Sequence, residues 1–272
     1  MKEFKIRITN KNKTLIKKLF NTEHLVHEES LFWDNLFKII CQKIEDKNKI
    51  QVMLDIIWLI VSSMKILITY DVSDLECLIK TNNEDWNNSI SFYSSYLQSD
   101  YSVKFKWSAF MNNQLEKLKS FINNWNYIFF LMIMNIMHFL FLTCEMKCDE
   151  MMLEIVNRQN AHNMTLVMRD VVKLFRLVKH EQELHQKILA FSILYDHCSV
   201  RIYDHYSVIN EKNTIFYCYL IHEFSFMILN DKEKWTAYKF IRNIYNNFMS
   251  MYLKRICWAI DQLFSDLNFD IL

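Results

Sequence analysis

Glycine and proline are both absent from this chain of 272 residues. At average usage a chain of this length would contain about 19 glycines and about 14 prolines. Without glycine, a turn that needs a positive φ angle must use Asn, Asp or a strained residue, so tight two-residue hairpins become costly. Without proline, no helix is interrupted from within. Both absences favour helices joined by loops rich in Asn, Asp and Lys.

The lack of glycine also excludes several classes of enzyme site. P-loops, the dinucleotide-binding GxGxxG turn, the kinase glycine loop and the GxSxG nucleophile elbow all need glycine where the backbone meets the ligand. None of these motifs occurs in the sequence. The skew towards Ile, Asn, Lys and Phe is typical of an AT-rich coding bias, but its physical consequences hold whatever its cause.

The charged residues are balanced, with 32 basic and 31 acidic side chains and a net charge of +1. This balance argues against a dedicated nucleic-acid groove, so no specific nucleic-acid partner is expected. Seven cysteines, an odd number in mostly apolar surroundings, favour unpaired thiols in a reducing compartment. The first residues lack the apolar stretch of a secretory signal. We therefore expect an intracellular protein that is not secreted, with membrane association as an open alternative.

Two short stretches alternate between apolar and polar residues, as a strand with one buried face does. In residues 2–9, Phe4, Ile6 and Ile8 alternate with charged or polar residues, and residues 101–107 repeat the pattern. We expect these two strands to pair as a minor two-stranded ribbon. Because an isolated ribbon is only marginally stable, it would have to lie on helices.

Helical periodicity dominates the rest of the chain. Apolar residues recur at spacings of three and four in residues 23–46 and 164–192, and residues 231–264 fit one long final helix. No shift in composition marks a domain boundary, and no repeat of solenoid length is present. The expected fold is all-α, an irregular multi-helix bundle in which residues 1–272 form a single helical domain.

Two segments, 52–70 and 127–144, are dense in hydrophobic residues over 19 and 18 positions, and a shorter one covers 214–229. The first two are long enough to span a membrane. However, lysines flank 127–144 on both sides, without the asymmetry that usually orients a span. We therefore expect 52–70 and 127–144 to be central helices of a soluble bundle, and spans at all three segments remain the alternative. Polar residues form a stripe along the second segment: Asn124, Asn135, His138 and Glu145.

The metal-binding patterns that helices carry by themselves are incomplete here. The HExxH pattern of zinc proteases needs two histidines one helical turn apart. His180 and Glu181 are instead followed by His185, one residue too far. None of the nine histidines has a Glu three residues before it, as di-iron bundles require. The sequence thus assigns no catalytic, cofactor-binding or metal-binding residue, and no cofactor is expected.

The stretch ILYDHCSVRIYDHYSVI, residues 193–209, contains two Asp-His pairs eight positions apart. On a helix, eight residues advance about 12 Å and rotate the second copy by roughly 80°. On a strand, His197 and His205 would share a face but lie about 26 Å apart. Neither arrangement lets both histidines bind one ion, because zinc–nitrogen bonds are about 2 Å long. We interpret the repeat as part of an amphipathic helix.

No motif in the sequence identifies a family. The observations favour a non-catalytic helical scaffold that binds a protein partner, or a second copy of itself, through helix surfaces. An integral membrane protein with two or more spans is the alternative. A minor alternative is a metal-dependent hydrolase or nuclease with an unfamiliar helical site that uses His180, Glu181 and His185.

Overall fold

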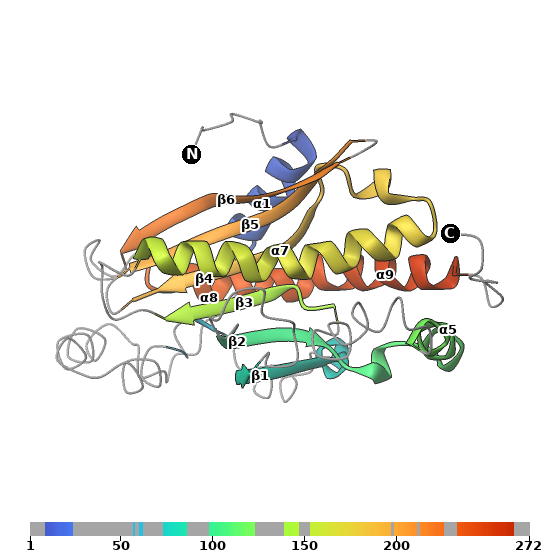
Figure 1. The fold of residues 1–272 in the computed structure, drawn as a ribbon. Coiled ribbons are helices and arrows are strands. Elements are labelled where there is room, and N and C mark those ends of the chain that lie inside the picture. The colour runs from blue at the N-terminus through green and yellow to red at the C-terminus, as the bar shows by residue number, and fades with distance from the viewer. Residues whose placement is uncertain are drawn as a thin grey trace.

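A six-stranded mixed sheet forms the centre of the molecule (Figure 1). A computed structural model describes residues 9–23, 57, 60–61, 73–85, 98–122, 139–146, 153–196, 199–210, 213–225 and 233–263. The strands lie in chain order across the sheet: β1 (Leu78–Asp85), β2 (Gln98–Phe105), β3 (Leu142–Met146), β4 (Ile188–Tyr195), β5 (Ser199–Ile209) and β6 (Thr214–Ser225). The expected all-α bundle is therefore wrong.

The sheet consists of two antiparallel meanders. β1, β2 and β3 form the first, and β4, β5 and β6 form the second. They join where β3 and β4 run parallel, and helix α7 (Leu153–Leu177) makes that connection. A parallel pair needs such a crossover because the chain must return to the same end of the sheet. The carboxyl ends of β3 and β4 thus lie beside the amino ends of β2 and β5, at what we call the β3–β4 end.

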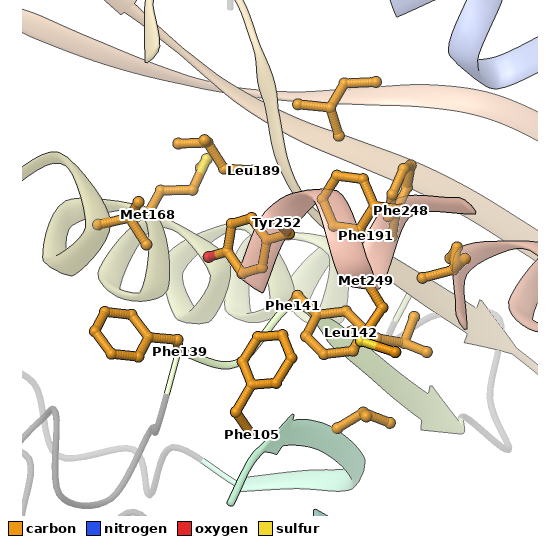
Figure 2. Packing of buried hydrophobic residues seen from close by; sticks show 14 of the residues in the cluster. Phe105, Phe139, Phe141, Leu142, Met168, Leu189, Phe191, Phe248, Met249 and Tyr252 are labelled. Atoms are coloured by element: carbon orange, nitrogen blue, oxygen red, sulfur yellow. The ribbon is translucent and has the colours of Figure 1, made fainter. Parts of the chain in front are cut away.

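The C-terminal helices supply an aromatic core to one face of the sheet. α8 (Thr236–Asn243), a π-helical segment (Ile244–Met249) and α9 (Ser250–Asp261) follow one another without a break. The ring of Phe248 lies 5.0 Å from that of Phe191 and 5.3 Å from that of Tyr252, centroid to centroid (Figure 2). The long final helix expected at 231–264 is confirmed from Thr236 to Asp261.

Two further helices attach to this C-terminal unit. α1 (Asn10–Asn21) packs against α8, and the side chain of Asn243 donates a hydrogen bond of 2.8 Å to the carbonyl of Leu19. α5 (Asn112–Ile122) packs against α9, where Gln114 Nε2 donates to Asp261 Oδ1 at 2.9 Å. Side-chain amides therefore anchor both helices.

Helix α7 covers the other face of the sheet. Thr143 Oγ1 donates to Met164 Sδ at 3.4 Å, and Tyr203 donates its hydroxyl proton to Asn157 Oδ1 at 3.1 Å. Further along, Phe175 contacts Trp258 of α9, with ring centroids 6.0 Å apart. We call the side that carries Thr143 and Tyr203 the α7 face, and the opposite side the core face.

The strand expected at 101–107 is confirmed for residues 101–105, which belong to β2, whereas Trp107 begins a 3-10 helix. The expected ribbon with residues 2–9 is wrong. Both edges of residues 101–103 are occupied, one by β1 and the other by β3. Of residues 2–9 themselves, only Thr9, the N-cap of α1, is among the described residues.

The expected central helices are corrected where the structure describes them. Residues 142–144, the end of segment 127–144, belong to strand β3, and residues 214–225 form strand β6. Of 52–70 only positions 57, 60 and 61 are described, and the helix expected at 23–46 lies almost entirely outside the described residues. β3 is buried at every position, and a short apolar run of this kind cannot be told from a buried helix by its sequence. Among the helices that the structure describes, none is long and apolar enough to cross a bilayer.

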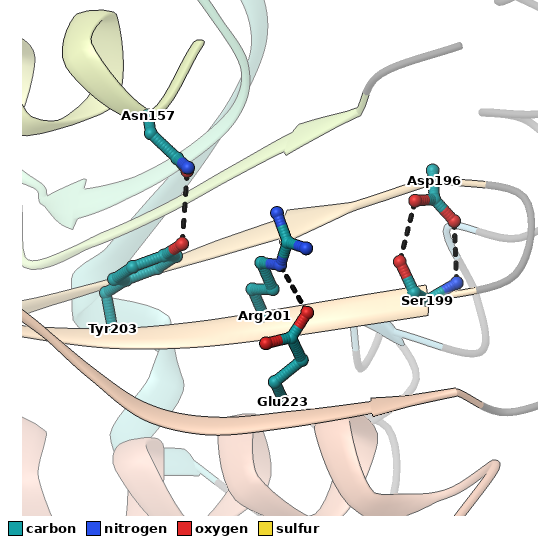
Figure 3. A network of polar contacts seen from close by, with 6 residues as sticks. All are labelled: Asn157, Asp196, Ser199, Arg201, Tyr203 and Glu223. Atoms are coloured by element: carbon teal, nitrogen blue, oxygen red, sulfur yellow. Dashed lines mark hydrogen bonds and ion pairs between the residues drawn. The ribbon is translucent and has the colours of Figure 1, made fainter. Parts of the chain in front are cut away.

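The helix expected at 164–192 is wrong in part, and the helix expected across the repeat at 193–209 is wrong throughout. α7 ends at Leu177, and residues 188–209 form the β4–β5 hairpin. Asp196 closes its turn, because its carboxylate accepts 2.6 Å hydrogen bonds from the backbone N–H and the hydroxyl of Ser199 (Figure 3). The carboxylate of Asp196 therefore stabilises this turn in a chain that has no glycine.

Positive φ angles without glycine occur at Phe139 (52°), Lys179 (59°) and Gln186 (55°) within the described ranges. None of these is Asn or Asp, so the chain uses strained residues in the left-handed region. Asn210 and Asn213 close the β5–β6 hairpin by exchanging backbone hydrogen bonds of 2.9 and 3.2 Å. Hairpins therefore form without glycine, through loops longer than the two-residue turns that were expected to be costly.

Candidate functional site

Two carboxylates lie opposite each other near the β3–β4 end. The β2–β3 register pairs Ser102 with Thr143 and Tyr101 with Cys144, so the next pair is Asp100 with Glu145. Side chains alternate along a strand, which places Glu145 on the same α7 face as Thr143. Residues directly opposite each other in antiparallel strands have Cβ atoms about 5 Å apart. Asp100 and Glu145 are therefore close neighbours.

The environment of this pair favours a positive charge. Glu145 is only 3% exposed, while Asp100 is half-buried. Asp100 Oδ2 accepts a hydrogen bond of 2.7 Å from the backbone N–H of Met146, which fixes it against β3. Like charges directly opposite in a sheet destabilise it, and a carboxylate removed from water needs compensation. A divalent cation coordinated by both side chains would offset the repulsion between them.

A buried polar chain lies on the same face, between α7 and the sheet. Asn160 Nδ2 donates to Ser192 Oγ at 2.7 Å, and Ser192 Oγ is 2.7 Å from His205 Nε2. Burial lowers the pKa of His205 to about 3, so its ring is neutral near neutral pH. A serine and a histidine at this distance would suit a nucleophile and its base. Both side chains are fully buried, however, so no substrate reaches them and the chain of hydrogen bonds is structural.

More polar contacts mark the β3–β4 end on β5 and β6 (Figure 3). Arg201 Nε donates to Glu223 Oε1 at 2.6 Å across the two strands. Tyr203 contacts Asn157 near the start of α7, and burial raises the pKa of this tyrosine to about 12. The charge of Glu223 is therefore neutralised by Arg201.

The residues considered for a helical metal site are not brought together. His180 and His185 flank a 3-10 helix (Glu181–Leu184) rather than sharing one face of an α-helix. His180 Nδ1 lies 3.1 Å from Glu183 Oε1 at the surface, whereas His185 Nδ1 lies 2.9 Å from the carbonyl of Ile209. Each ring thus has its own partner.

The donor set of the carboxylate pair suits one type of metal. In the described part of the chain, no three His, Cys, Asp or Glu side chains are grouped to hold an ion. Zinc sites need three or four protein ligands. Mg²⁺ is instead bound by one or two carboxylates together with waters and substrate phosphates. Asp100 and Glu145 therefore fit Mg²⁺ and do not fit zinc.

Comparison with known families gives one assignment. Residues 36–260 match the model of DUF7924, a domain of unknown function. The chain belongs to this family. No curated protein and no solved structure matches it. The part that corresponds to DUF7924 contains the Asp100–Glu145 pair and the whole sheet, whereas α1 precedes it.

Sequence reasoning missed the carboxylate pair in this DUF7924 domain because it placed Glu145 on a helical stripe. Glu145 lies on strand β3, and Asn124, Asn135 and His138 are outside the described residues. A usable signal was present: Asp100 directly precedes the alternating stretch 101–107, and Glu145 closes the apolar run of 127–144. Carboxylates at the edges of two apolar segments indicate one end of a sheet once both segments are recognised as strands.

Proposed function

We propose that the domain is a divalent-metal-dependent hydrolase of phosphate esters, in which Asp100 and Glu145 hold the metal. The proposal rests on the placement of these carboxylates at the β3–β4 end. Asp100 Oδ2 accepts a hydrogen bond from Met146 N–H, and the β2–β3 register, continued by one residue beyond Tyr101 and Cys144, sets Glu145 opposite Asp100. Ligands of sheets with parallel strands bind outside the carboxyl ends of those strands. Glu145 is the penultimate residue of β3, which runs parallel to β4.

The chemistry of the pair supports this reaction class. When bound, Mg²⁺ supplies Lewis acidity to a phosphoryl oxygen. The chain contributes two hard oxygen donors on neighbouring strands. The hydrogen bond from Met146 N–H to Asp100 orients one of them, and the packing around the buried Glu145 orients the other. Donors held on strands keep their geometry better than donors on loops.

One further group is suggested by the sequence alone. Glu145 is followed by Met146 and Lys147, and Lys147 lies outside the described residues. A lysine ammonium stabilises negative charge that develops on a phosphate. We therefore include Lys147 among the residues to be tested.

Metal binding is tested first and independently of activity. Mn²⁺ alone is titrated into the full chain, and the free ion is followed by electron paramagnetic resonance. Asp100→Asn and Glu145→Gln should each weaken Mn²⁺ binding at least about 10-fold. The matched control is Glu223→Gln, a carboxylate at the same end of the sheet that pairs with Arg201, and it should bind Mn²⁺ as the wild type does.

Hydrolysis is then measured with Mg²⁺ or Mn²⁺ on bis(nitrophenyl) phosphate, plasmid DNA and RNA. The wild type and Glu223→Gln should hydrolyse at least one of these, whereas Asp100→Asn, Glu145→Gln and Lys147→Gln should be strongly impaired. If the wild type binds no Mn²⁺ at millimolar concentration, or if Glu145→Gln binds it unchanged, the proposal fails. The balanced net charge remains an argument against a dedicated nucleic-acid groove, so we specify the bond and not the polymer.

A non-catalytic role in binding a protein partner stays a prediction, as does an intracellular location. The four cysteines in the described part of the chain are free thiols.

A further inference from the structure

β6 is the last strand of the sheet, and among the described strands only β5 pairs with it. At 12 residues it is longer than any other strand of the sheet. Its apolar side chains are unusually accessible, with 48% of Ile215, 48% of Tyr219 and 39% of Leu220 exposed. These residues lie on both faces of the strand, because Tyr219 pairs with Asp204 and Leu220 pairs with Tyr203. Neither face is therefore fully covered in the middle of β6.

The strand lacks most of the devices by which proteins protect a sheet edge. Such edges usually carry lysine, proline or inward-pointing charges, or are very short. Thr214–Ser225 contains no Lys, Arg or Pro, and its one acidic residue, Glu223, is engaged by Arg201. The register shift opposite Ile202 and Tyr203 leaves Ile221 as a bulge, which is a single local interruption. Residues 214–220 remain regular.

We propose that β6 is a dimerisation edge, on which β6 of a second copy of this chain pairs antiparallel about a two-fold axis near Tyr219. The two six-stranded sheets would then form one continuous sheet. The new pairing would supply hydrogen-bond partners for the outward backbone groups of β6, and the exposed apolar side chains would cover each other.

A second copy fits this edge because the strand is compatible with itself. In a two-fold arrangement each residue of β6 lies opposite a residue of the same strand in the second copy. A charged residue near the axis would therefore lie close to an identical charge and repel it. Residues 214–221 carry no charged side chain. With the axis at Tyr219, Cys218 lies opposite Leu220. No charged side chain lies next to the axis, and the accessible Tyr219 and Leu220 are in the centre.

The test is the oligomeric state of the full chain. Sedimentation velocity is measured from about 1 µM to about 100 µM for the wild type, Tyr219→Lys and Met251→Lys. Tyr219 and Met251 are both large, apolar and accessible, at 48% and 41% exposed, but Met251 lies on α9, away from the edge. We expect the wild type and Met251→Lys to be dimers, and Tyr219→Lys to dissociate at least about 10-fold more readily.

Circular dichroism must show that Tyr219→Lys is folded, and Leu220→Lys provides a second disruption on the other face of β6. A wild type that stays monomeric over the whole range overturns the proposal. Equal dissociation of Tyr219→Lys and Met251→Lys also overturns it.

Removal of residues 1–8 tests whether the N-terminal segment, rather than a second copy, covers the edge of β6. If the wild type is monomeric and the truncated chain dimerises, the N-terminal segment of the chain itself covers the edge, and the proposal is wrong.

Discussion

Asp204 should make the stability of this protein fall as the pH rises. Its side chain is fully buried on β5, and neither carboxylate oxygen has a hydrogen-bond partner among the described residues. Burial raises the pKa of Asp204 from 3.8 to about 8. The native protein therefore holds this carboxyl protonated at neutral pH, whereas the unfolded chain ionises it.

The sign and size of the effect follow from proton linkage. Between the unfolded and folded pKa values the native state binds more protons, so the free energy of unfolding decreases with rising pH. Each pH unit is worth about 1.4 kcal/mol, so the loss between about pH 5 and about pH 8 is roughly 4 kcal/mol. Asp204→Asn has nearly the same shape and cannot ionise. Its stability relative to the wild type should therefore increase by about that amount over the same interval.

Urea unfolding followed by tryptophan fluorescence, repeated at four pH values across this range, measures the difference. Glu116→Gln, on the exposed side of α5, is the control and should leave the pH dependence of the wild type in place. If the stability curves of the wild type and Asp204→Asn run parallel from about pH 5 to about pH 8, the carboxyl is not protonated in the native state and the reasoning is refuted.

Two further predictions concern the interior. Phe191 is fully buried, with its ring centroid 5.6 Å from that of Phe240 and 5.0 Å from that of Phe248. Phe191→Ala should therefore lower the free energy of unfolding by about 3–5 kcal/mol, as measured by urea unfolding. A loss below about 1 kcal/mol would contradict the packing of α8 on the sheet. Ser192→Ala leaves the Asn160 amide and His205 Nε2 without their shared partner and should cost about 1–3 kcal/mol. Any hydrolytic activity of the folded variant should persist, and its abolition at unchanged stability would make Ser192 a catalytic residue.

Local sequence signals were sufficient where polar and apolar residues alternate along a strand or where the helix is long. The alternation at 101–105 and the periodicity of 236–261 both correspond to elements of the structure. The first part of the periodic stretch 164–192 is likewise helix α7. In each case the apolar residues fall on one side, so the period can be read.

The same signals failed for strands that carry apolar residues on both faces. β4, ILAFSILY, is buried at every position, and β3 ends an apolar run in which no period is visible. β5 was misread for a different reason. Its polar residues Asp204, His205 and Ser207 are buried, whereas polar residues are normally expected at the surface. The Asp100–Glu145 pair could not be found before the strands were paired, since its members are 45 positions apart and meet only through the β2–β3 register.

The anchoring of α1 has a consequence for folding during synthesis. Asn243 donates to the carbonyls of Leu19 and Thr22, at sequence separations of 224 and 221, and Asn12 donates to the carbonyl of Gln186. A helix of 12 residues is marginal in water by itself. Ribosomes add about 5–20 residues per second, so α1 leaves the ribosome roughly 10 to 45 seconds before its docking site exists. Helix α1 therefore cannot complete its docking until Asn243 of α8 has been synthesised, so these contacts form late in the folding of the chain.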